Sequence, residues 1–172
     1  MLKNIYIIGP LGAGKSSVGK YLAKLLKRPF YDSDREVEKR SGVNIEWMFD
    51  VEGEAGFKAR EQTVVEDLSK EEGIVLATGG GTVENPVCRE ALANGIVIYI
   101  QVAFEEQATR VKRFPWKRPQ LRSADPEQKL LELNEQREQL YASIADYSYV
   151  NSNKNPYFLA RKIVKDIAAD DQ

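Results

Sequence analysis

A glycine-rich motif near the start of the chain constrains the fold more than any other feature of the sequence. The apolar run Ile5–Ile8 leads directly into Gly-Pro-Leu-Gly-Ala-Gly-Lys-Ser at positions 9–16, and helical spacing follows over Lys15–Leu26. A strand, the pattern G-x-x-x-x-G-K-S and a helix, in this order, are typical of a phosphate-binding loop. The motif therefore predicts an α/β domain that binds a nucleoside triphosphate. The alternative is a glycine-rich turn followed by a surface lysine.

The motif also predicts a role for each of its residue types. Gly12 and Gly14 allow the backbone to wrap around a phosphate with its N–H groups pointing inward, and the start of the helix adds the positive end of its dipole. We expect Lys15 to reach the outer phosphates and the Ser16 hydroxyl to bind Mg²⁺. The residues of this loop that are expected to bind ATP are Gly12, Ala13, Gly14, Lys15, Ser16 and Ser17.

Apolar runs and helical segments alternate along the whole chain. The β-prone runs are Ile5–Ile8, Pro29–Tyr31, Ile74–Ala77, Ile96–Ile100 and Tyr147–Val150. The segments with helical spacing are Lys15–Leu26, Asp34–Ser41, Glu54–Lys70, Pro86–Ala93, Phe104–Lys112, Pro126–Ala142 and Pro156–Ala168. Most of the β-prone runs are almost continuously apolar, as are strands that are covered on both faces of a parallel sheet. The 172 residues therefore predict one three-layer α/β domain.

Two aspartates follow the second β-prone run, at positions 32 and 34. Ligands bind at the carboxyl ends of strands in open α/β sheets, and an extended Asp-x-Asp directs both side chains to one face. We expect Asp32 to hold Mg²⁺, directly or through water, and Asp34 to accept a hydrogen bond from an acceptor hydroxyl. The alternative role for Asp34 is to cap the helix that follows it.

Three consecutive glycines, Gly79, Gly80 and Gly81, follow the third β-prone run. Without side chains, their backbone is open to close approach by a ligand. Their amides are therefore expected to bind a carboxylate or a sugar-like hydroxyl. The alternative is a plain tight loop.

The segment Thr109–Arg122 carries six basic residues and no acidic one, which leaves −7 on the rest of a chain whose net charge is −1. Pro115 and Pro119 interrupt any helix there. The segment predicts a mobile lid that closes over a polyphosphate and supplies an arginine. A solvated basic loop is the alternative, and nucleic-acid binding by a single patch on a nearly neutral chain is disfavoured.

Arg137 lies on an apolar helical stripe, where spacing predicts a buried side chain. A buried guanidinium requires an anion, which is either a protein carboxylate or a substrate. In the helical segment Glu54–Lys70, Lys58 and Arg60 point in nearly opposite directions, so they do not serve one ligand. Glu61 stands close enough to Lys58 to steady it.

The absence of histidine excludes Ser-His-Asp catalysis, histidine-ligated zinc and haem with a proximal histidine. The single cysteine, Cys88, cannot form an internal disulfide and fits a reducing cytoplasm. The N-terminal apolar run is too short for a signal peptide or a membrane span. We therefore expect a cytoplasmic enzyme without membrane or nucleic-acid partners, whose chemistry uses carboxylates, cations, hydroxyls and a hard metal ion.

Seven motifs in order resemble the shikimate kinase family and cover nearly the whole chain. They are Gly9–Ser17, the pair Asp32 and Asp34, Gly56-Phe57-Lys58, Thr78–Gly81, Arg118-Pro119, Arg137–Tyr141 and the turn Asn155-Pro156. The resemblance implies a P-loop nucleoside-monophosphate-kinase-like fold, with a parallel five-stranded sheet in the order 2-3-1-4-5. It also implies ATP- and Mg²⁺-dependent phosphorylation of the 3-hydroxyl of shikimate, a step of aromatic amino-acid biosynthesis, by a single-domain monomer spanning residues 1–172.

The resemblance assigns roles to individual residues. In an acceptor-binding region at about 33–61, Asp34 would be the candidate base. The acceptor's ring and carboxylate would be held by Lys58 of this region and, from outside it, by Gly79, Gly80, Gly81 and Arg137. Within a lid at about 110–123, Arg118 would reach the ATP phosphates. Arg110 and Lys154 would flank the adenine. Lys15, Asp34 and Arg118 would thus be the catalytic residues.

The chain departs from the family pattern at two positions. Lys58 stands where the family usually has arginine, so the bidentate fork to a carboxylate is lost. The lid reads Arg118-Pro119-Gln120-Leu121 instead of Arg-Pro-Leu-Leu. Two alternative functions stay open: a kinase of the same fold for another small molecule, such as gluconate or a nucleotide, and a nucleotide-binding regulatory module without transfer activity.

Overall fold

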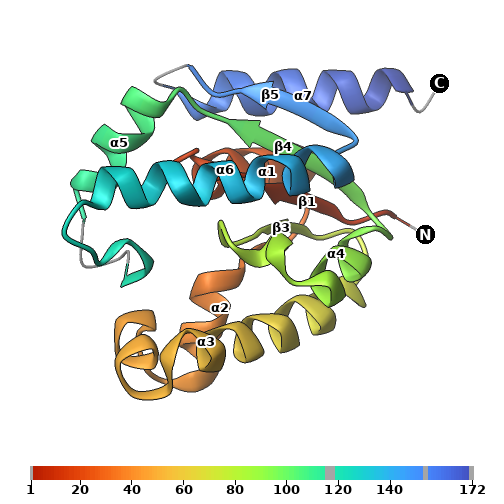
Figure 1. Ribbon diagram of the computed structural model, residues 1–172. Helices are drawn as coiled ribbons and strands as arrows, with labels where there is room; N and C mark the ends of the chain where they lie inside the picture. Colours follow the sequence, from red (N-terminus) through yellow and green to blue (C-terminus); the bar gives the residue numbers. More distant parts are fainter. Residues whose placement is uncertain (1, 115–118, 153–154, 171–172) are drawn as a thin grey trace.

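The computed structural model describes residues 2–114, 119–152 and 155–170 (Figure 1). At its centre is one parallel sheet in the order β2-β3-β1-β4-β5. The strands are β1 (Ile5–Ile8), β2 (Phe30–Asp32), β3 (Val75–Ala77), β4 (Ile96–Gln101) and β5 (Tyr147–Val150). This confirms the predicted sheet and strand order, and each strand lies within two residues of its predicted bounds.

Helices connect the strands and cover both faces of the sheet. The α-helices are α1 (Lys15–Leu26), α2 (Ser33–Ser41), α3 (Ile45–Ser69), α4 (Pro86–Leu92), α5 (Phe104–Lys112), α6 (Pro126–Ile144) and α7 (Pro156–Asp170). Two short 3₁₀ turns, η1 (Thr82–Glu84) and η3 (Pro119–Leu121), lie in the connections. Every helix expected from the sequence is present.

The alternation of side chains along β1 explains the three layers. Ile5 and Ile7 pack on one face, against α1 and α7, whereas Tyr6 and Ile8 pack on the other face, against the second half of α3, α4 and α6. All four side chains are completely buried. The sheet is therefore sandwiched between two helical layers, and only its carboxyl edge remains for ligands.

The sequence interpretation missed the first part of α3. It placed a helix over Glu54–Lys70, but α3 begins at Ile45, where the Asn44 side chain caps it by accepting a hydrogen bond from the Trp47 amide at 2.8 Å. The helix is broken at Gly53, whose φ of 74° and ψ of 178° are not helical. Glycine adopts this conformation without strain, so the two helical pieces meet at an angle. In Figure 1, α2 and the first turns of α3 form a lobe that stands away from the sheet.

The helix cap after β2 also differs from the expectation. Asp32, not Asp34, is the cap of α2, and its Oδ1 accepts hydrogen bonds from the Asp34 and Arg35 amides at 3.0 and 3.2 Å. The extended Asp-x-Asp predicted from the sequence is therefore wrong, because the strand ends at Asp32 and Asp34 already lies in the first turn of the helix. The capping role considered for Asp34 is wrong for the same reason.

Two further observations concern the described residues. No helix among them is long and apolar enough to cross a membrane.

Cys88 is buried in the core, and burial raises the pKa of its thiol to about 12. The thiolate form, which would be the reactive one, is therefore negligible near neutral pH.

Candidate active site

Two adjoining pockets open at the carboxyl edge of the sheet. The larger encloses about 2040 Å³ of space, including space open to solvent, and the smaller about 480 Å³. The larger is lined chiefly by the phosphate-binding loop, the start of α2 and the end of α5: Leu11, Gly12, Gly14, Lys15, Ser16, Ser17, Asp32, Asp34, Arg35, Arg110 and Phe114. The smaller is lined by α2, α3, the glycine triplet, η3 and α6: Asp34, Ile45, Phe49, Glu54, Phe57, Lys58, Glu61, Gly79, Gly80, Gly81, Gln120 and Arg137.

The phosphate-binding loop is held open by side chains from elsewhere in the chain. Three of them each donate a hydrogen bond to a successive loop carbonyl: Gln107 to Leu11 at 2.8 Å, Arg110 to Gly12 at 2.9 Å and Asn151 to Ala13 at 2.8 Å. These hydrogen bonds, together with that of the Ala13 amide to the Pro10 carbonyl at 3.2 Å, fix the loop in one conformation before an anion binds. Sequence reasoning found Arg110 but missed Gln107 and Asn151, because nothing local in the sequence relates α5 and the end of β5 to this loop.

Lys15 projects from the first turn of α1. Its ammonium donates hydrogen bonds of 2.8 Å to the carbonyls of Gly9 and Pro10, and the residue is only 9% exposed. These contacts hold the charge inside the loop, where a bound polyphosphate would sit. Gly12 and Gly14 have φ angles of 73° and 88°, which explains why the loop requires glycine at both positions.

Ser16 and Asp32 provide adjoining oxygen atoms at the edge of the larger pocket. The Ser16 hydroxyl donates a hydrogen bond to Asp32 Oδ2. A hydroxyl and a carboxylate are the hard oxygen donors that Mg²⁺ prefers. In the described part of the chain, no group of three or more acidic, cysteine or histidine side chains could hold an ion alone. The donor set therefore fits an Mg²⁺ ion that is shared with the phosphates of a nucleotide, which is its usual mode in kinases.

Asp34 lies where the two pockets meet, because it lines both of them, as do Ile45, Gly79 and Gly80. Its carboxylate lies beside the glycine triplet: a β-carbon at Gly79 would come within 2.9 Å of Asp34 Oδ1 and 2.7 Å of Glu61 Oε2. Any side chain at position 79 would displace these carboxylates. The Gly79 amide also donates a hydrogen bond of 2.9 Å to Ser33 Oγ, which fixes the triplet against the start of α2.

Glu61 was missed as a site residue. It lies on α3, is only 3% exposed, and accepts a hydrogen bond of 2.8 Å from the Thr82 hydroxyl. Burial, and then the charge of Asp34, raise the pKa of Glu61 to about 7. The site thus contains a carboxyl group that holds a proton under conditions in which most carboxyl groups are ionised.

The raised pKa of Glu61 predicts a pH-dependent stability. The native protein keeps the Glu61 proton between pH 4.5 and about 7, whereas the unfolded chain releases it near pH 4.5. The contribution to stability is therefore complete below pH 4.5 and is lost as the pH rises through 7, by about 3 kcal/mol in total. We expect Glu61→Gln, which cannot ionise, to flatten the fall in the free energy of unfolding between pH 5 and 8.

Urea unfolding at several pH values measures this effect. The matched control is Glu72→Gln, because Glu72 is exposed and follows the same helix. An unchanged pH profile in Glu61→Gln would show that Glu61 titrates normally.

Glu84 links the two cations of the smaller pocket. Its Oε2 lies 3.0 Å from Lys58 Nζ and its Oε1 lies 2.7 Å from Arg137 Nε. Burial opposes the ionisation of Glu84, but the hydrogen bonds and charges of Arg137 and Lys58 outweigh it and hold the pKa below its usual value. The expectation that Glu61 steadies Lys58 is therefore wrong: Glu84 does so, with Glu54 at 3.3 Å. As expected, the neighbouring arginine of α3, Arg60, points elsewhere and pairs with Glu52.

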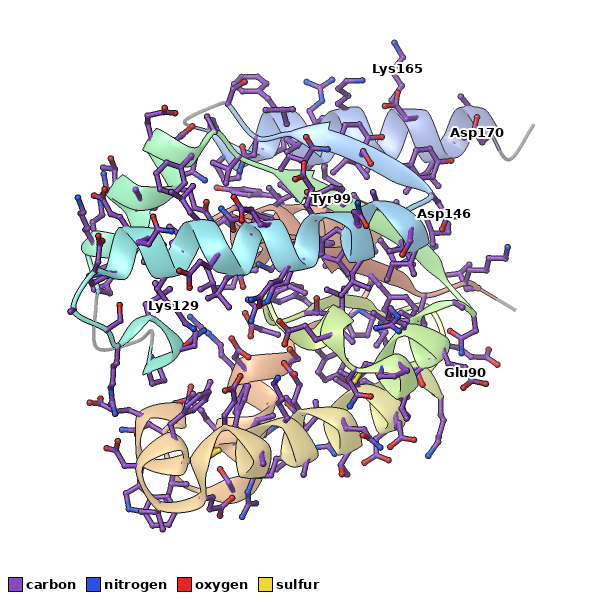
Figure 2. All side chains as sticks on the ribbon, viewed as in Figure 1. Glu90, Tyr99, Lys129, Asp146, Lys165 and Asp170 are labelled. Atoms are coloured by element: carbon purple, nitrogen blue, oxygen red, sulfur yellow. The ribbon has the colours of Figure 1, made fainter. Side chains whose placement is uncertain are left out.

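Arg137 is buried on α6, as its position on the apolar stripe predicts. Glu84 engages only its Nε, and the guanidinium lies against the glycine triplet: a β-carbon at Gly81 would come within 3.0 Å of Arg137 Nη2. One turn further along α6, the Tyr141 hydroxyl donates a hydrogen bond of 2.5 Å to the Gly80 carbonyl. Its ring stacks on that of Tyr99 of β4, which is labelled in Figure 2. The triplet is thus shaped by α6 as well as by α2.

Much of the basic segment expected to be a lid is paired with acidic residues. Arg110 contacts Glu106 within α5, and Lys112 pairs with Glu127 of α6. Arg122 bridges to the first turns of α3, through Asp50 at 2.5 Å and Glu46 at 3.2 Å. Arg118 and Lys154, which were expected to contact ATP, lie outside the described residues.

The comparisons with known proteins agree with this geometry. A family model described as shikimate kinase matches residues 11–168. Shikimate kinase from Pseudoalteromonas atlantica is 47% identical over 166 residues, with 96% of each chain covered, and that from Tolumonas auensis is 51% identical over 147 residues, with 84% of this chain and 85% of the relative covered.

Solved structures show the same relationship. Shikimate kinase from Acinetobacter baumannii in complex with shikimate superposes with a TM-score of 0.95 at 43% identity, covering 99% of this chain and 95% of that one. A gluconokinase from Sinorhizobium meliloti has a TM-score of 0.55 at 14% identity and shares the fold alone. The family match along almost the entire chain, together with relatives this similar, shows that the chain belongs to the shikimate kinase family.

Proposed function

We propose that this chain transfers the γ-phosphoryl group of ATP to the 3-hydroxyl of shikimate, giving shikimate 3-phosphate and ADP. The observation that carries the proposal is the position of Asp34, which lines both the pocket of the phosphate-binding loop and the pocket with Lys58 and Arg137. A carboxylate at this junction stands where a phosphate donor and a hydroxyl acceptor would meet.

The larger pocket is the proposed nucleotide site. The amides of Gly12, Ala13, Gly14, Ser16 and Ser17 would bind the phosphates, as would Lys15. Arg110, which already contacts the loop carbonyl of Gly12, and Lys154 would flank the adenine. Mg²⁺ would be held by Ser16 and by Asp32, directly or through water, and would neutralise charge on the phosphate oxygens when bound.

The smaller pocket is the proposed acceptor site. Lys58 and Arg137 supply positive charge, and the amides of the glycine triplet Gly79–Gly81 supply hydrogen-bond donors. Because Glu84 engages only the Nε of Arg137, we assign the terminal guanidinium nitrogens to the acceptor's carboxylate. Asp34 would accept the hydrogen bond of the hydroxyl that is phosphorylated.

The proposed reaction is an in-line displacement. The bond between the γ-phosphorus and the bridging oxygen of ATP breaks as the bond to the acceptor oxygen forms, and the hydroxyl proton passes to Asp34. Phosphoryl transfer leaves the protein mainly positioning and charge stabilisation to perform. Lys15 and Arg118 would stabilise the charge on the transferred group.

A coupled assay of ADP release tests the proposed function against the alternatives. Shikimate is expected to stimulate ATP turnover, whereas gluconate and nucleoside monophosphates at equal concentrations are not. Stimulation by one of the other acceptors instead would reassign the substrate. ATP binding without any acceptor-dependent ADP release would indicate a regulatory module.

Lys58→Arg is expected to lower the KM for shikimate. Arginine would restore a bidentate fork toward the acceptor's carboxylate, and one additional hydrogen bond is worth about 1 kcal/mol, or about fivefold in KM. Steady-state kinetics at saturating ATP measure the effect. Arg60→Lys is the matched control on the same helix, because Arg60 pairs with Glu52 outside the pocket. An equal or higher KM in Lys58→Arg would contradict the prediction.

We further propose that residues 1–172 act as one catalytic domain, with an acceptor-binding region at about 33–61 and a lid at about 110–123. The buried single cysteine and the net charge of −1 support a cytoplasmic enzyme that binds neither nucleic acid nor membranes. We also propose that it acts as a monomer.

A further inference from the structure

Gln120 has a buried polar atom that forms no hydrogen bond within the described part of the chain. The residue lies in the short turn η3 and lines the smaller pocket, as the glycine triplet also does. Its carboxamide oxygen is buried and has no hydrogen-bond partner among the described residues. A buried polar atom without a partner destabilises the folded protein, so a ligand that supplies a donor at this place would remove that penalty.

The two basic side chains that line this pocket both contact acidic groups. Lys58 lies between Glu84 and Glu54, and Arg137 donates to Glu84. The remaining polar side chains there, those of Asp34 and Glu61, are carboxyl groups. None of the described residues donates a hydrogen bond to the Gln120 carboxamide oxygen, and a molecule that fills the pocket would supply the missing donor.

The backbone of Gln120 is anchored on both sides. Pro119 and Leu121 are buried, and Leu121 packs in a cluster with Leu11 and Leu130. The Arg122 amide donates a hydrogen bond of 3.1 Å to the Pro119 carbonyl, which closes the turn. The turn also contacts α3 and α6, the two helices that carry the cations of the pocket. These contacts fix the backbone of Gln120, and the side chain of Gln120 is therefore held at the pocket.

We propose that Gln120 is a specificity residue of the acceptor site, whose carboxamide oxygen accepts a hydrogen bond from an acceptor hydroxyl that is not phosphorylated. This inference rests on the proposed function. It assigns a role to the position at which this chain departs from the leucine of the family pattern. The contact favours an acceptor that has a hydroxyl within reach of the Gln120 carboxamide oxygen, because an analogue without this hydroxyl would leave the buried oxygen unpaired.

The chemistry of shikimate allows a direct test. If the 3-hydroxyl receives the phosphoryl group, the hydroxyls at positions 4 and 5 are the candidate donors to Gln120. The dissociation constants of shikimate, 4-deoxyshikimate and 5-deoxyshikimate are measured by calorimetry for the wild type, Gln120→Met and Gln120→Leu. Methionine keeps nearly the same shape without polar atoms, and Gln128→Met on the exposed first turn of α6 is the matched control.

We expect Gln120→Met to weaken shikimate binding by about 3- to 10-fold, and to leave unchanged the binding of the one analogue that lacks the bonded hydroxyl. Gln120→Leu is expected to show the same selective pattern. An equal factor for all three ligands, or no change for any of them, would overturn the assignment. The turnover of wild-type enzyme with shikimate is measured separately, so a failure of the proposed function is distinguished from a failure of this inference.

Discussion

In the Lys15→Met variant, the shikimate-dependent kcat is expected to fall by about 10²- to 10³-fold. Lys15 is the cation that the phosphate-binding loop holds at its centre, against the carbonyls of Gly9 and Pro10. A fixed positive charge in a water-poor site stabilises the charge that develops on a transferred phosphoryl group, and removing one such group typically costs 10²- to 10³-fold. Because Lys15 also contacts the ground-state phosphates in this proposal, the KM for ATP is expected to rise as well.

Two measurements separate this effect from damage to the fold. Lys20→Met changes an exposed lysine on the same helix and is expected to retain wild-type kinetics. The thermal midpoint of Lys15→Met is compared with that of the wild type, because methionine leaves two loop carbonyls without their donor. Activity within tenfold of the wild type would remove Lys15 from the proposed catalytic residues.

The fold was predictable from the sequence because its strongest signals are local. Each buried strand is a short apolar run, and the phosphate-binding loop joins the first of them to α1 over a few residues. The first turns of α3 were missed because Gly53 interrupts the helical pattern there. At Gly53 the chain changes direction between the first turns of α3 and the part of α3 that packs on the sheet. Because glycine disfavours a helix interior, the sequence before it was not predicted to be helical.

The candidate site was only partly predictable, because several of its contacts join distant parts of the chain. The ion pair of Arg137 with Glu84 spans 53 residues, and the hydrogen bond of Asn151 to the loop spans 138. Spacing indicated that Arg137 needed an anion but could not name it. Glu61 was visible in the sequence only as a neighbour of Lys58. Its function in the site depends on burial and on the charge of Asp34, both of which arise only in the folded chain.

Asp34→Asn is expected to reduce kcat by about 10²- to 10⁴-fold, the range typical of a lost general base. The amide keeps nearly the same size and still accepts a hydrogen bond from the acceptor hydroxyl, so the KM for shikimate is expected to change much less than kcat. Glu90→Gln is the matched control: Glu90 projects from α4, at the end of the molecule away from α5 and η3 (Figure 2). A kcat reduced less than tenfold would show that the protein does not need this carboxylate for the transfer.

The same variant provides a second readout that depends on charge rather than on catalysis. The negative charge of Asp34 is, after burial, the main cause of the raised pKa of Glu61. Asp34→Asn removes that charge, so the pKa of Glu61 is expected to fall, and the loss of stability with rising pH is expected to shift to lower pH. If kcat collapses while the pH dependence of unfolding shifts in this direction, the substitution has removed the charge within an otherwise intact site. If kcat collapses and the pH dependence is unchanged, Asp34 and Glu61 are not coupled, and the junction of the two pockets is not arranged as proposed.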